Sequence, residues 1–366
     1  MPLGTKTSKR TRRGRPGQAK AIPPNPFVAL LSTVQKDIDR RLESYFADQL
    51  ELVAPRGREV TAMVASLARL CLRGGKRLRP GLLVAGFRVA QPEGDLEPAL
   101  DAGLAVELLH TYLLVHDDWM DGDALRRGGP SVHTELAKRF KSEHRGHASA
   151  ILAGDFAAGL ALEVLSRVAV PPAHGMALVQ AFAQMQQHAI LGQQLDVAAT
   201  EHDPEEAYAL KTGSYTVRGP LRLGALLGGA KPGMLKALDG FAEPVGIAFQ
   251  LADDLLSAFG NPGATGKARG NDLRAGKRTP LVLEALRRAR GRDRRHLTQI
   301  LGKARASDAE IERALDILGR SGARKKTEAR IEALLAEGLG ALGTGVNRRG
   351  RELLEGAALA LTARRV

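Results

Sequence analysis

The chain has 366 residues, of which 44% are hydrophobic and only 4% aromatic, and its formal net charge is +14. Its single cysteine, Cys71, excludes an intramolecular disulfide and favours a reducing, cytoplasmic location. Because no run of about 18 apolar residues occurs, we expect no membrane-spanning helix. The scarcity of aromatic side chains also argues against a protein that stacks nucleic-acid bases.

Residues 1–26 are predicted to form a basic, disordered N-terminal tail. Residues 1–20 hold seven basic and no acidic side chains, which is half of the net charge. Their Gly- and Pro-rich composition cannot bury a core, and they lack the apolar stretch of a secretory signal. We interpret this segment as a solvated tail, with weak binding to acidic lipid or nucleic acid as the alternative.

Residues 27–366 are predicted to fold as a single large domain made of helices. Leu and Ala dominate, and apolar residues recur at spacings of three and four. Several helices are apolar around much of their circumference, so they must be buried in a multi-helix bundle. We therefore predict an all-α bundle with a central cleft, and chain breaks at Gly74-Gly75, Gly128–Pro130 and Gly219-Pro220. The predicted helical segments are Ile38–Phe46, Val60–Leu72, Leu82–Ala90, Leu100–Val115, Ala148–Val168, Met176–Ala198, Leu221–Leu227, Met234–Phe259, Pro280–Arg288, Leu297–Leu301, Asp308–Leu318, Ala323–Leu342 and Glu352–Ala363.

The first chemically informative segment is Gly74 to Pro80, where two glycines precede three bases. We expect a helix to begin there, and the free N–H groups at a helix start favour an anion. The segment thus predicts an anion site that includes Lys76, Arg77 and Arg79. A solvated basic turn is the alternative interpretation.

An acidic cluster follows the predicted helix Leu100–Val115. Asp117 and Asp121 are four residues apart, so both carboxylates project from one helix face. Such hard oxygen ligands suit Mg²⁺, which binds proteins through one or two carboxylates and keeps waters or substrate phosphates. Arg126 and Arg127 follow closely, as an anionic ligand would require. An acidic, solvated helix end is the alternative.

A second aspartate pair, Asp253-Asp254, ends the helix Met234–Phe259. The next segment, residues 260–279, is rich in glycine and contains Lys267 and Lys277. Glycines allow such a loop to close over a ligand, and the lysines can neutralise phosphate oxygens. This pair is a weak signal by itself and a strong one together with Asp117 and Asp121.

Smaller polar features interrupt other apolar segments. Lys211-Thr212-Gly213 forms a polar stretch that we expect to lie between two apolar helices. Gln193 and Asp196 are three residues apart on an otherwise apolar helix. His110 precedes Asp117 by seven residues, which places both on nearly the same helix face. A satisfied core histidine is the alternative for His110.

In their order and spacing, these motifs resemble those of the trans-isoprenyl diphosphate synthases of the polyprenyl synthetase family. The resemblance covers about Val28 to Arg365. It implies a Mg²⁺-dependent prenyltransferase that condenses isopentenyl diphosphate with a dimethylallyl, geranyl or farnesyl diphosphate. It also implies a homodimer, with no specific nucleic-acid partner. The motifs are Gly75 to Pro80, Asp117 to Asp121 with Arg126 to Gly128, Lys211-Thr212, Phe249-Gln250, Asp253-Asp254 and Lys267.

The resemblance also implies roles for individual residues. The diphosphate of isopentenyl diphosphate would be held by Lys76, Arg79, His110 and Arg127. The allylic diphosphate would be gripped by Arg126, Lys211, Lys267 and Lys277. Three Mg²⁺ ions would be bound by Asp117, Asp121 and Asp253. The metal ligands would be supported, from behind or through metal-bound water, by Asp118, Asp254, Gln193 and Asp196. The allylic carbocation that forms during the reaction would have two polar neighbours, Thr212 and Gln250.

One position departs from the family pattern. The second motif has Ser257 where the family usually has a third aspartate, so Asp253 would be its main metal ligand. We expect weaker support for the metal there and not a loss of activity.

Product length is predicted from the residues that precede Asp117. The resemblance nominates Tyr112 as a limit to chain growth, while ordinary packing is the alternative. Leu113 lies one turn before Asp117, and a leucine there favours a twenty-carbon product of the geranylgeranyl type over a fifteen-carbon farnesyl one. A class I terpene cyclase and a non-catalytic helical subunit are the remaining alternatives. A terpene cyclase should carry a further metal-binding triad on the later helix, which this chain lacks. A non-catalytic subunit should have lost metal ligands that this chain keeps.

Overall fold

The computed structural model describes residues 25–198, 203–260 and 269–363. Most of the predicted tail and Lys267 lie outside the described residues. The first helix, α1, begins at Pro26, and the side chain of Asn25 caps it by accepting from the N–H groups of Phe27 and Val28. The same side chain donates to the carbonyl of Gly356 at 2.9 Å, so the start of α1 is fastened to the last helix.

The prediction of an all-α fold is confirmed. The described residues form helices joined by short turns, with one pair of two-residue strands. The elements are α1 (Pro26–Val53), η1 (Ala54–Arg56), α2 (Arg58–Leu72), α3 (Leu78–Ala90), α4 (Glu97–Met120), β1 (Leu125–Arg126), β2 (Gly129–Pro130), α5 (Val132–Phe140), α6 (Glu143–Ser166), α7 (Pro172–Ala198), α8 (Pro204–Tyr208), η2 (Ala209–Arg218), α9 (Gly219–Leu227), α10 (Pro232–Phe259), α12 (Asn271–Arg274), α13 (Pro280–Arg288), α14 (Gly291–Ile300), α15 (Asp308–Arg320), α16 (Ala323–Ala341) and α17 (Arg348–Thr362).

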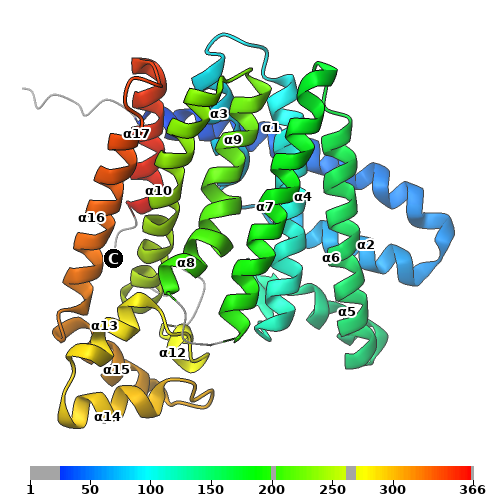
Figure 1. The fold of residues 1–366 in the computed structure, drawn as a ribbon. Helices are drawn as coiled ribbons and strands as arrows, with labels where there is room; N and C mark the ends of the chain where they lie inside the picture. Colours follow the sequence, from blue (N-terminus) through cyan, green and yellow to red (C-terminus); the bar gives the residue numbers. More distant parts are fainter. Residues whose placement is uncertain (1–24, 199–202, 261–268, 364–366) are drawn as a thin grey trace, which may run out of the picture.

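Figure 1 shows the long helices α16, α10, α7, α4 and α6 running in roughly the same direction, with the segment α8–η2–α9 between α10 and α7. The carboxyl-terminal ends of α4 and α10 point to the same end of the molecule, the lower end in Figure 1, where α12 to α15 are also found. The two predicted aspartate pairs are at these helix ends, Asp117 within the last turn of α4 and Asp253 in the last two turns of α10. The architecture therefore brings two segments that are 136 residues apart in sequence to one end of the bundle.

The apolar circumference of α4 has a structural explanation, because the helix is packed inside the bundle. Leu108 and Leu109 are fully buried. By length and composition α4 and α6 could each span a membrane, but 78% of the apolar window of α4 and 44% of that of α6 are buried. Close helix contacts depend on small residues. A Cβ atom at Gly224 would lie 1.8 Å from the carbonyl oxygen of Leu83, so only glycine lets α9 approach α3 this closely.

Two of the predicted chain breaks have different outcomes. Gly128–Pro130 does form a break, the turn between β1 and β2. The prediction of a break at Gly219-Pro220 is wrong, because α8, η2 and α9 form one continuous helical segment. Its middle part, η2, has π-helical hydrogen bonding, and Pro220 follows directly after this altered hydrogen-bond ladder. The expectation that Lys211-Thr212-Gly213 lies between helices is wrong for the same reason.

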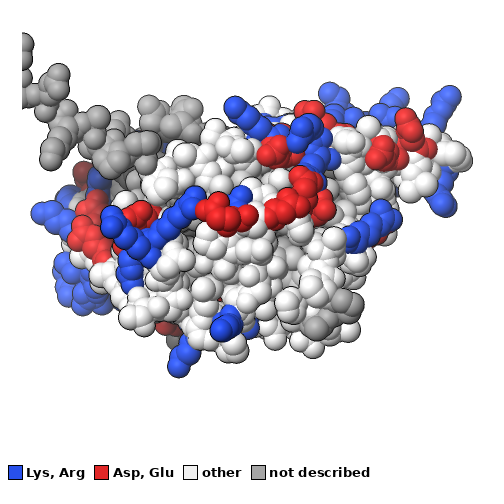
Figure 2. Space-filling view, turned by 90° about the horizontal axis from the view of Figure 1, so that it is seen from above, with Lys and Arg blue, Asp and Glu red and all other residues white. Residues whose placement is uncertain are grey.

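The surface seen from above carries charges of both signs, with acidic side chains beside basic ones (Figure 2). Ion pairs of this kind occur across the described residues. Arg41, for example, pairs with Glu97 at 2.6 Å and with Asp101 at 2.5 Å. Such surface pairs contribute little stability.

Candidate active site

Asp117 and Asp121 lie at the carboxyl-terminal end of α4, each with a lysine beside it. Nζ of Lys211, from η2, is 3.3 Å from Oδ1 of Asp117. Nζ of Lys277, which precedes α13, donates to Oδ2 of Asp121 at 3.1 Å. Burial opposes ionisation of Asp117, but Lys211 and Lys277 outweigh it and hold the pKa of Asp117 below its ordinary value. Asp117 therefore stays ionised.

Asp196 of α7 joins the two lysines into one cluster. Lys211 donates to Oδ2 of Asp196 at 2.5 Å, and Nζ of Lys277 lies 4.0 Å from the same oxygen. Although burial works against the charge of Lys277, Asp121 and Asp196 raise its pKa above the ordinary value. The structure thus brings five residues that were selected from the sequence together from four separate segments. Gln193, also selected, lies one turn before Asp196, and its Nε2 is 4.0 Å from Sδ of Met120.

Asp118 points the other way and is buried. Its Oδ1 accepts from Nε of Arg126 at 2.5 Å, and Nη2 of Arg126 also reaches Oδ2 of Asp123 at 3.0 Å and Oδ2 of Asp117 at 3.8 Å. Burial raises the pKa of Asp118 to about 6, against the opposing effect of Arg126. Asp118 therefore holds Arg126 at the edge of the Asp117–Asp121 cluster.

Arg127 faces a second, basic region on α4 and α3. Its Nη2 lies 3.5 Å from Nε2 of His110. A Cβ atom at Gly75 would be 3.1 Å from the same Nη2, and the φ angle of +150° at Gly75 also disfavours any side chain there. Arg79 is fixed nearby, since it donates to Oγ1 of Thr216 at 2.8 Å and stacks on the ring of Tyr215 at 4.3 Å.

His110 is neutral in this basic region. It is buried, and its pKa is well below the ordinary value because of that burial and because of the neighbouring Arg79 and Arg127. Arg79, Arg127 and the exposed Lys76 on the preceding segment bring three positive charges together here, and the carboxylate that reaches Arg127 is Glu107, with Oε1 4.0 Å from Nη2. This excess of positive charge suits an anionic ligand.

The prediction that Arg77 contributes to this anion site is wrong. Its side chain is buried, with Nη1 donating to Oε1 of Glu107 at 2.5 Å and Nε donating to Oδ1 of Asp39 at 2.7 Å. A third bond joins Nη2 to the carbonyl of Cys71 at 2.9 Å. Glu107, an acid inside an apolar helix, was the sequence signal for this buried pair. Arg77 therefore holds α1, α2, α3 and α4 together.

The second aspartate pair has a different environment. Asp254 is buried, and its two oxygens accept from the hydroxyl of Tyr208 at 2.5 Å and from Nε2 of Gln250 at 3.3 Å. Thr212 donates in turn to Oε1 of Gln250 at 2.8 Å. Burial, with a further contribution from Asp272, raises the pKa of Asp254 well above its ordinary value. Asp253 is only partly buried. Tyr208, which completes this network, carried no distinguishing signal in the sequence.

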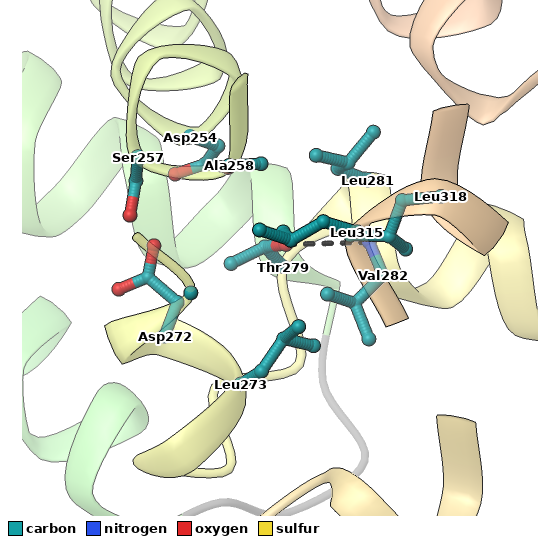
Figure 3. Close-up of a pocket in the computed structure, with 11 residues that line it drawn as sticks. Asp254, Ser257, Ala258, Asp272, Leu273, Thr279, Leu281, Val282, Leu315 and Leu318 are labelled. Atoms are coloured by element: carbon teal, nitrogen blue, oxygen red, sulfur yellow. Dashed lines mark hydrogen bonds between the residues drawn. The ribbon is translucent and has the colours of Figure 1, made fainter. Parts of the chain in front are cut away.

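Ser257 lies opposite a carboxylate from outside its own helix. Figure 3 shows the side chains of Ser257 and Asp272 pointing toward one another across a small pocket, with Asp254 on the same helix as Ser257. Asp272 belongs to α12, which Thr279 follows as the cap of α13. Asp272 therefore places a carboxylate beside Ser257, where α10 itself offers only a hydroxyl.

The carboxylates at the end of α4 suit a Mg²⁺ ion that takes its remaining ligands from water and substrate. Among the described residues, no three His, Cys, Asp or Glu side chains are grouped closely enough to enclose a metal ion. However, Oδ1 of Asp117 is buried and accepts no hydrogen bond from the part of the chain that is described, and ammonium groups already rest against Asp117 and Asp121. Hard oxygen atoms that attract cations, with the remaining ligands left to water and phosphate, are what Mg²⁺ prefers.

The two residues predicted to limit product length lie on α4 before Asp117. Tyr112 is buried, and its ring packs edge-on against His116 with 4.9 Å between ring centroids. Burial raises the pKa of its hydroxyl. Leu113 is partly buried against the main hydrophobic core.

Comparisons with known proteins agree on one family. The family model described as polyprenyl synthetase matches residues 61–318. A short chain isoprenyl diphosphate synthase of Methanocaldococcus jannaschii is 34% identical over 255 residues, which are 68% of this chain and 74% of that protein. A farnesyl diphosphate synthase of Escherichia coli is 36% identical over 279 residues, or 72% and 88% of the two chains. The crystal structure of a geranylgeranyl pyrophosphate synthase from Corynebacterium glutamicum, complexed with isoprenyl diphosphate and magnesium, has a TM-score of 0.85 at 34% identity, covering 92% of this chain and 99% of that one.

Proposed function

The chain belongs to the polyprenyl synthetase family and is a prenyltransferase, and on this premise we propose how its residues divide the reaction. It joins isopentenyl diphosphate to an allylic diphosphate with Mg²⁺ and makes geranylgeranyl diphosphate. The residues around Asp117 and Asp121 bind the allylic diphosphate, and the basic region around Arg127 binds isopentenyl diphosphate.

One observation carries this division of the site. Arg126 and Arg127 are adjacent in sequence, yet Arg126 is bonded to Asp118 at the acidic cluster while Arg127 faces His110 in the basic region. Arg127 has a φ angle of +51°, and this left-handed conformation turns the two side chains apart. Two anionic substrates can therefore be bound on either side of a single peptide bond, which supports a reaction between them.

The allylic carbon–oxygen bond must ionise, and bound Mg²⁺, held by Asp117, Asp121 and Asp253, would supply the Lewis acid that neutralises the leaving diphosphate. We propose three ions, as the family resemblance implies. Lys267, which lies outside the described residues, is a further base proposed for the same leaving group. Fixed positive charge is added there by Arg126, Lys211 and Lys277. These bases are already pre-positioned by Asp118, Asp121 and Asp196.

The second substrate is held by Arg79, Arg127, His110 and Lys76. Its double bond then attacks the allylic cation at close range, which is worth several kcal/mol of the barrier. Thr212 and Gln250 are hydrogen-bonded to each other and offer oxygen atoms as polar neighbours of the cation. The proton lost at the end of the step goes to the departing diphosphate, so the chain needs no separate base.

We further propose a homodimer that works in the cytoplasm. Large apolar side chains are exposed on α6 and α7, and exposed apolar surface of this kind supports an interface. They are Leu152, Leu162, Met176, Ile190, Leu191 and Val197.

The test is incubation of the purified protein with Mg²⁺, isopentenyl diphosphate and each of the dimethylallyl, geranyl and farnesyl diphosphates. We expect consumption of isopentenyl diphosphate and a twenty-carbon product from all three primers, and no turnover after chelation of the metal. A product that stops at fifteen carbons would identify a farnesyl diphosphate synthase instead. Failure to consume isopentenyl diphosphate with every primer would contradict the assignment.

A further inference from the structure

His116 lies between the metal-binding end of α4 and the neighbouring helix α6. Its Nε2 atom is 3.1 Å from the carbonyl oxygen of Ile151. Because a carbonyl oxygen only accepts, Nε2 carries the proton and donates. Oδ1 of the exposed Asp155 is 3.7 Å from the same nitrogen. The imidazole is therefore fixed to α6 by a hydrogen bond to the backbone.

The position of the imidazole depends on Gly154. A Cβ atom at Gly154 would lie 2.3 Å from Nε2 and 2.4 Å from Cδ2 of His116. These distances are well inside contact range, so any side chain at this position forces the ring to move. The absence of a Cβ atom thus provides the space in which the His116 ring lies flat against α6.

On its other side, His116 packs against Tyr112. The two rings meet edge to face, with centroids 4.9 Å apart and planes at 71°. The Tyr112 ring is consequently supported by His116, which is itself fixed to α6.

We propose that His116 is a positioning residue for product length, and that Gly154 is the specificity-determining position that makes room for it. This inference rests on the proposed function, in which Tyr112 limits the growth of the prenyl chain. A limit to chain length must resist the pressure of a longer chain, and an aromatic ring that can swing aside does not. His116 is hydrogen-bonded to the backbone of the adjacent helix α6 and cannot move together with the Tyr112 ring. It therefore blocks that movement.

The test compares product lengths from farnesyl diphosphate and isopentenyl diphosphate in His116→Ala, His116→Phe and Tyr112→Ala. Tyr112→Ala should lengthen the product. His116→Ala should raise the ratio of products longer than twenty carbons by about tenfold, the size of effect that one fitted group has on a pocket's discrimination. His116→Phe, which keeps a ring behind Tyr112, should raise it less. Because the effect passes through Tyr112, the double variant Tyr112→Ala/His116→Ala should match Tyr112→Ala.

Gly154→Ala provides an independent test from the facing helix, with Gly159→Ala as its matched control. Gly159 lies on the same helix with open space where its Cβ would be. We expect Gly154→Ala to change the product distribution and Gly159→Ala to leave it unchanged. Melting temperatures of all variants identify those that fold.

The possible failures are distinct. If Tyr112→Ala lengthens the product while folded His116→Ala and Gly154→Ala leave it at twenty carbons, the role of His116 is overturned and the proposed function stands. If His116→Ala lengthens the product further in the Tyr112→Ala background, it does not act through Tyr112. If Tyr112→Ala itself changes nothing, the limit assigned to Tyr112 in the proposed function is wrong and this inference falls with it.

Discussion

The two pairs of aspartates, Asp117 with Asp121 at the end of α4 and Asp253 with Asp254 near the end of α10, lie in different surroundings. Asp117 and Asp121 are surrounded by lysine and arginine side chains, and the pKa of Asp117 is lowered. Asp254 is buried among hydrogen-bond donors, and its pKa is raised well above the ordinary value by that burial. Asp117 is therefore kept charged for a cation, whereas Asp254 maintains the structure behind Asp253.

This difference follows from the position of each pair along its helix. α4 ends at Met120, one residue before Asp121, so Asp117 and Asp121 are on its last turn and face lysines that come from other segments. α10 continues for five residues after Asp254, so Asp254 is covered by the helix packing around it. The residue types thus set which ligands are available. Their position relative to the helix end determines which carboxylate can face a cation.

The largest expected effect is the loss of turnover when a metal-binding carboxylate is removed. Asp117→Asn and Asp253→Ala should each lower kcat by about 10²–10³-fold or more, because each removes charge stabilisation at the leaving group. The matched control is Asp48→Ala, an exposed aspartate on α1. Steady-state kinetics at saturating Mg²⁺ make the measurement. Near-normal turnover of Asp253→Ala would mean that only the first pair takes part in the reaction.

The second prediction concerns product length, which we assign to α4, the helix of Asp117, and not to α10. Leu113→Phe adds volume one turn before Asp117, so the share of fifteen-carbon product should rise by about tenfold. Leu113→Met, which nearly conserves volume, is the control. Product-length analysis after incubation with geranyl diphosphate measures the effect. An unchanged distribution in Leu113→Phe would show that this part of α4 does not contact the growing chain.

The third prediction tests whether Asp254 is structural. Tyr208→Phe leaves a buried oxygen of Asp254 without its donor, so the free energy of unfolding should fall by about 1–3 kcal/mol. Tyr45→Phe is a suitable control, because the buried Tyr45 hydroxyl has no hydrogen-bond partner among the described residues. Chemical denaturation of both variants gives the comparison. Equal stabilities would indicate that the Tyr208–Asp254 contact contributes nothing to the fold.

The smallest effect is expected at Ser257. Ser257→Asp should retain turnover within about fivefold, or about 1 kcal/mol in activation free energy. Without Mg²⁺, its melting temperature should fall, because the new carboxylate faces Asp272 across the small pocket. Thermal melts with and without Mg²⁺ check this. A variant that loses activity would contradict the view that Asp253 is the main ligand of the second pair.

Much of the fold and of the candidate site could be predicted from the sequence, because both depend on local patterns. The spacing of apolar residues gave the long helices, and the four-residue spacing of Asp117 and Asp121 placed them on one face. Gly219-Pro220 was misread as a break, because the π-helical hydrogen bonding of η2, which precedes Pro220 in a continuous helix, cannot be predicted from the local sequence. Arg77 was misread as an anion ligand because its partner Glu107 is 30 residues away in sequence.

The sequence by itself determined the helical class, the two acidic helix ends and the basic segments that accompany them, since composition and periodicity act over a few turns. Only the tertiary structure decided how these residues are used. It placed Lys211 and Lys277 on the first pair, buried Asp254 against Tyr208, and brought Asp272 to Ser257. It also set His116 against Gly154 of another helix. Charge and burial depend on neighbours in space, and helix packing, not local sequence, chooses those neighbours.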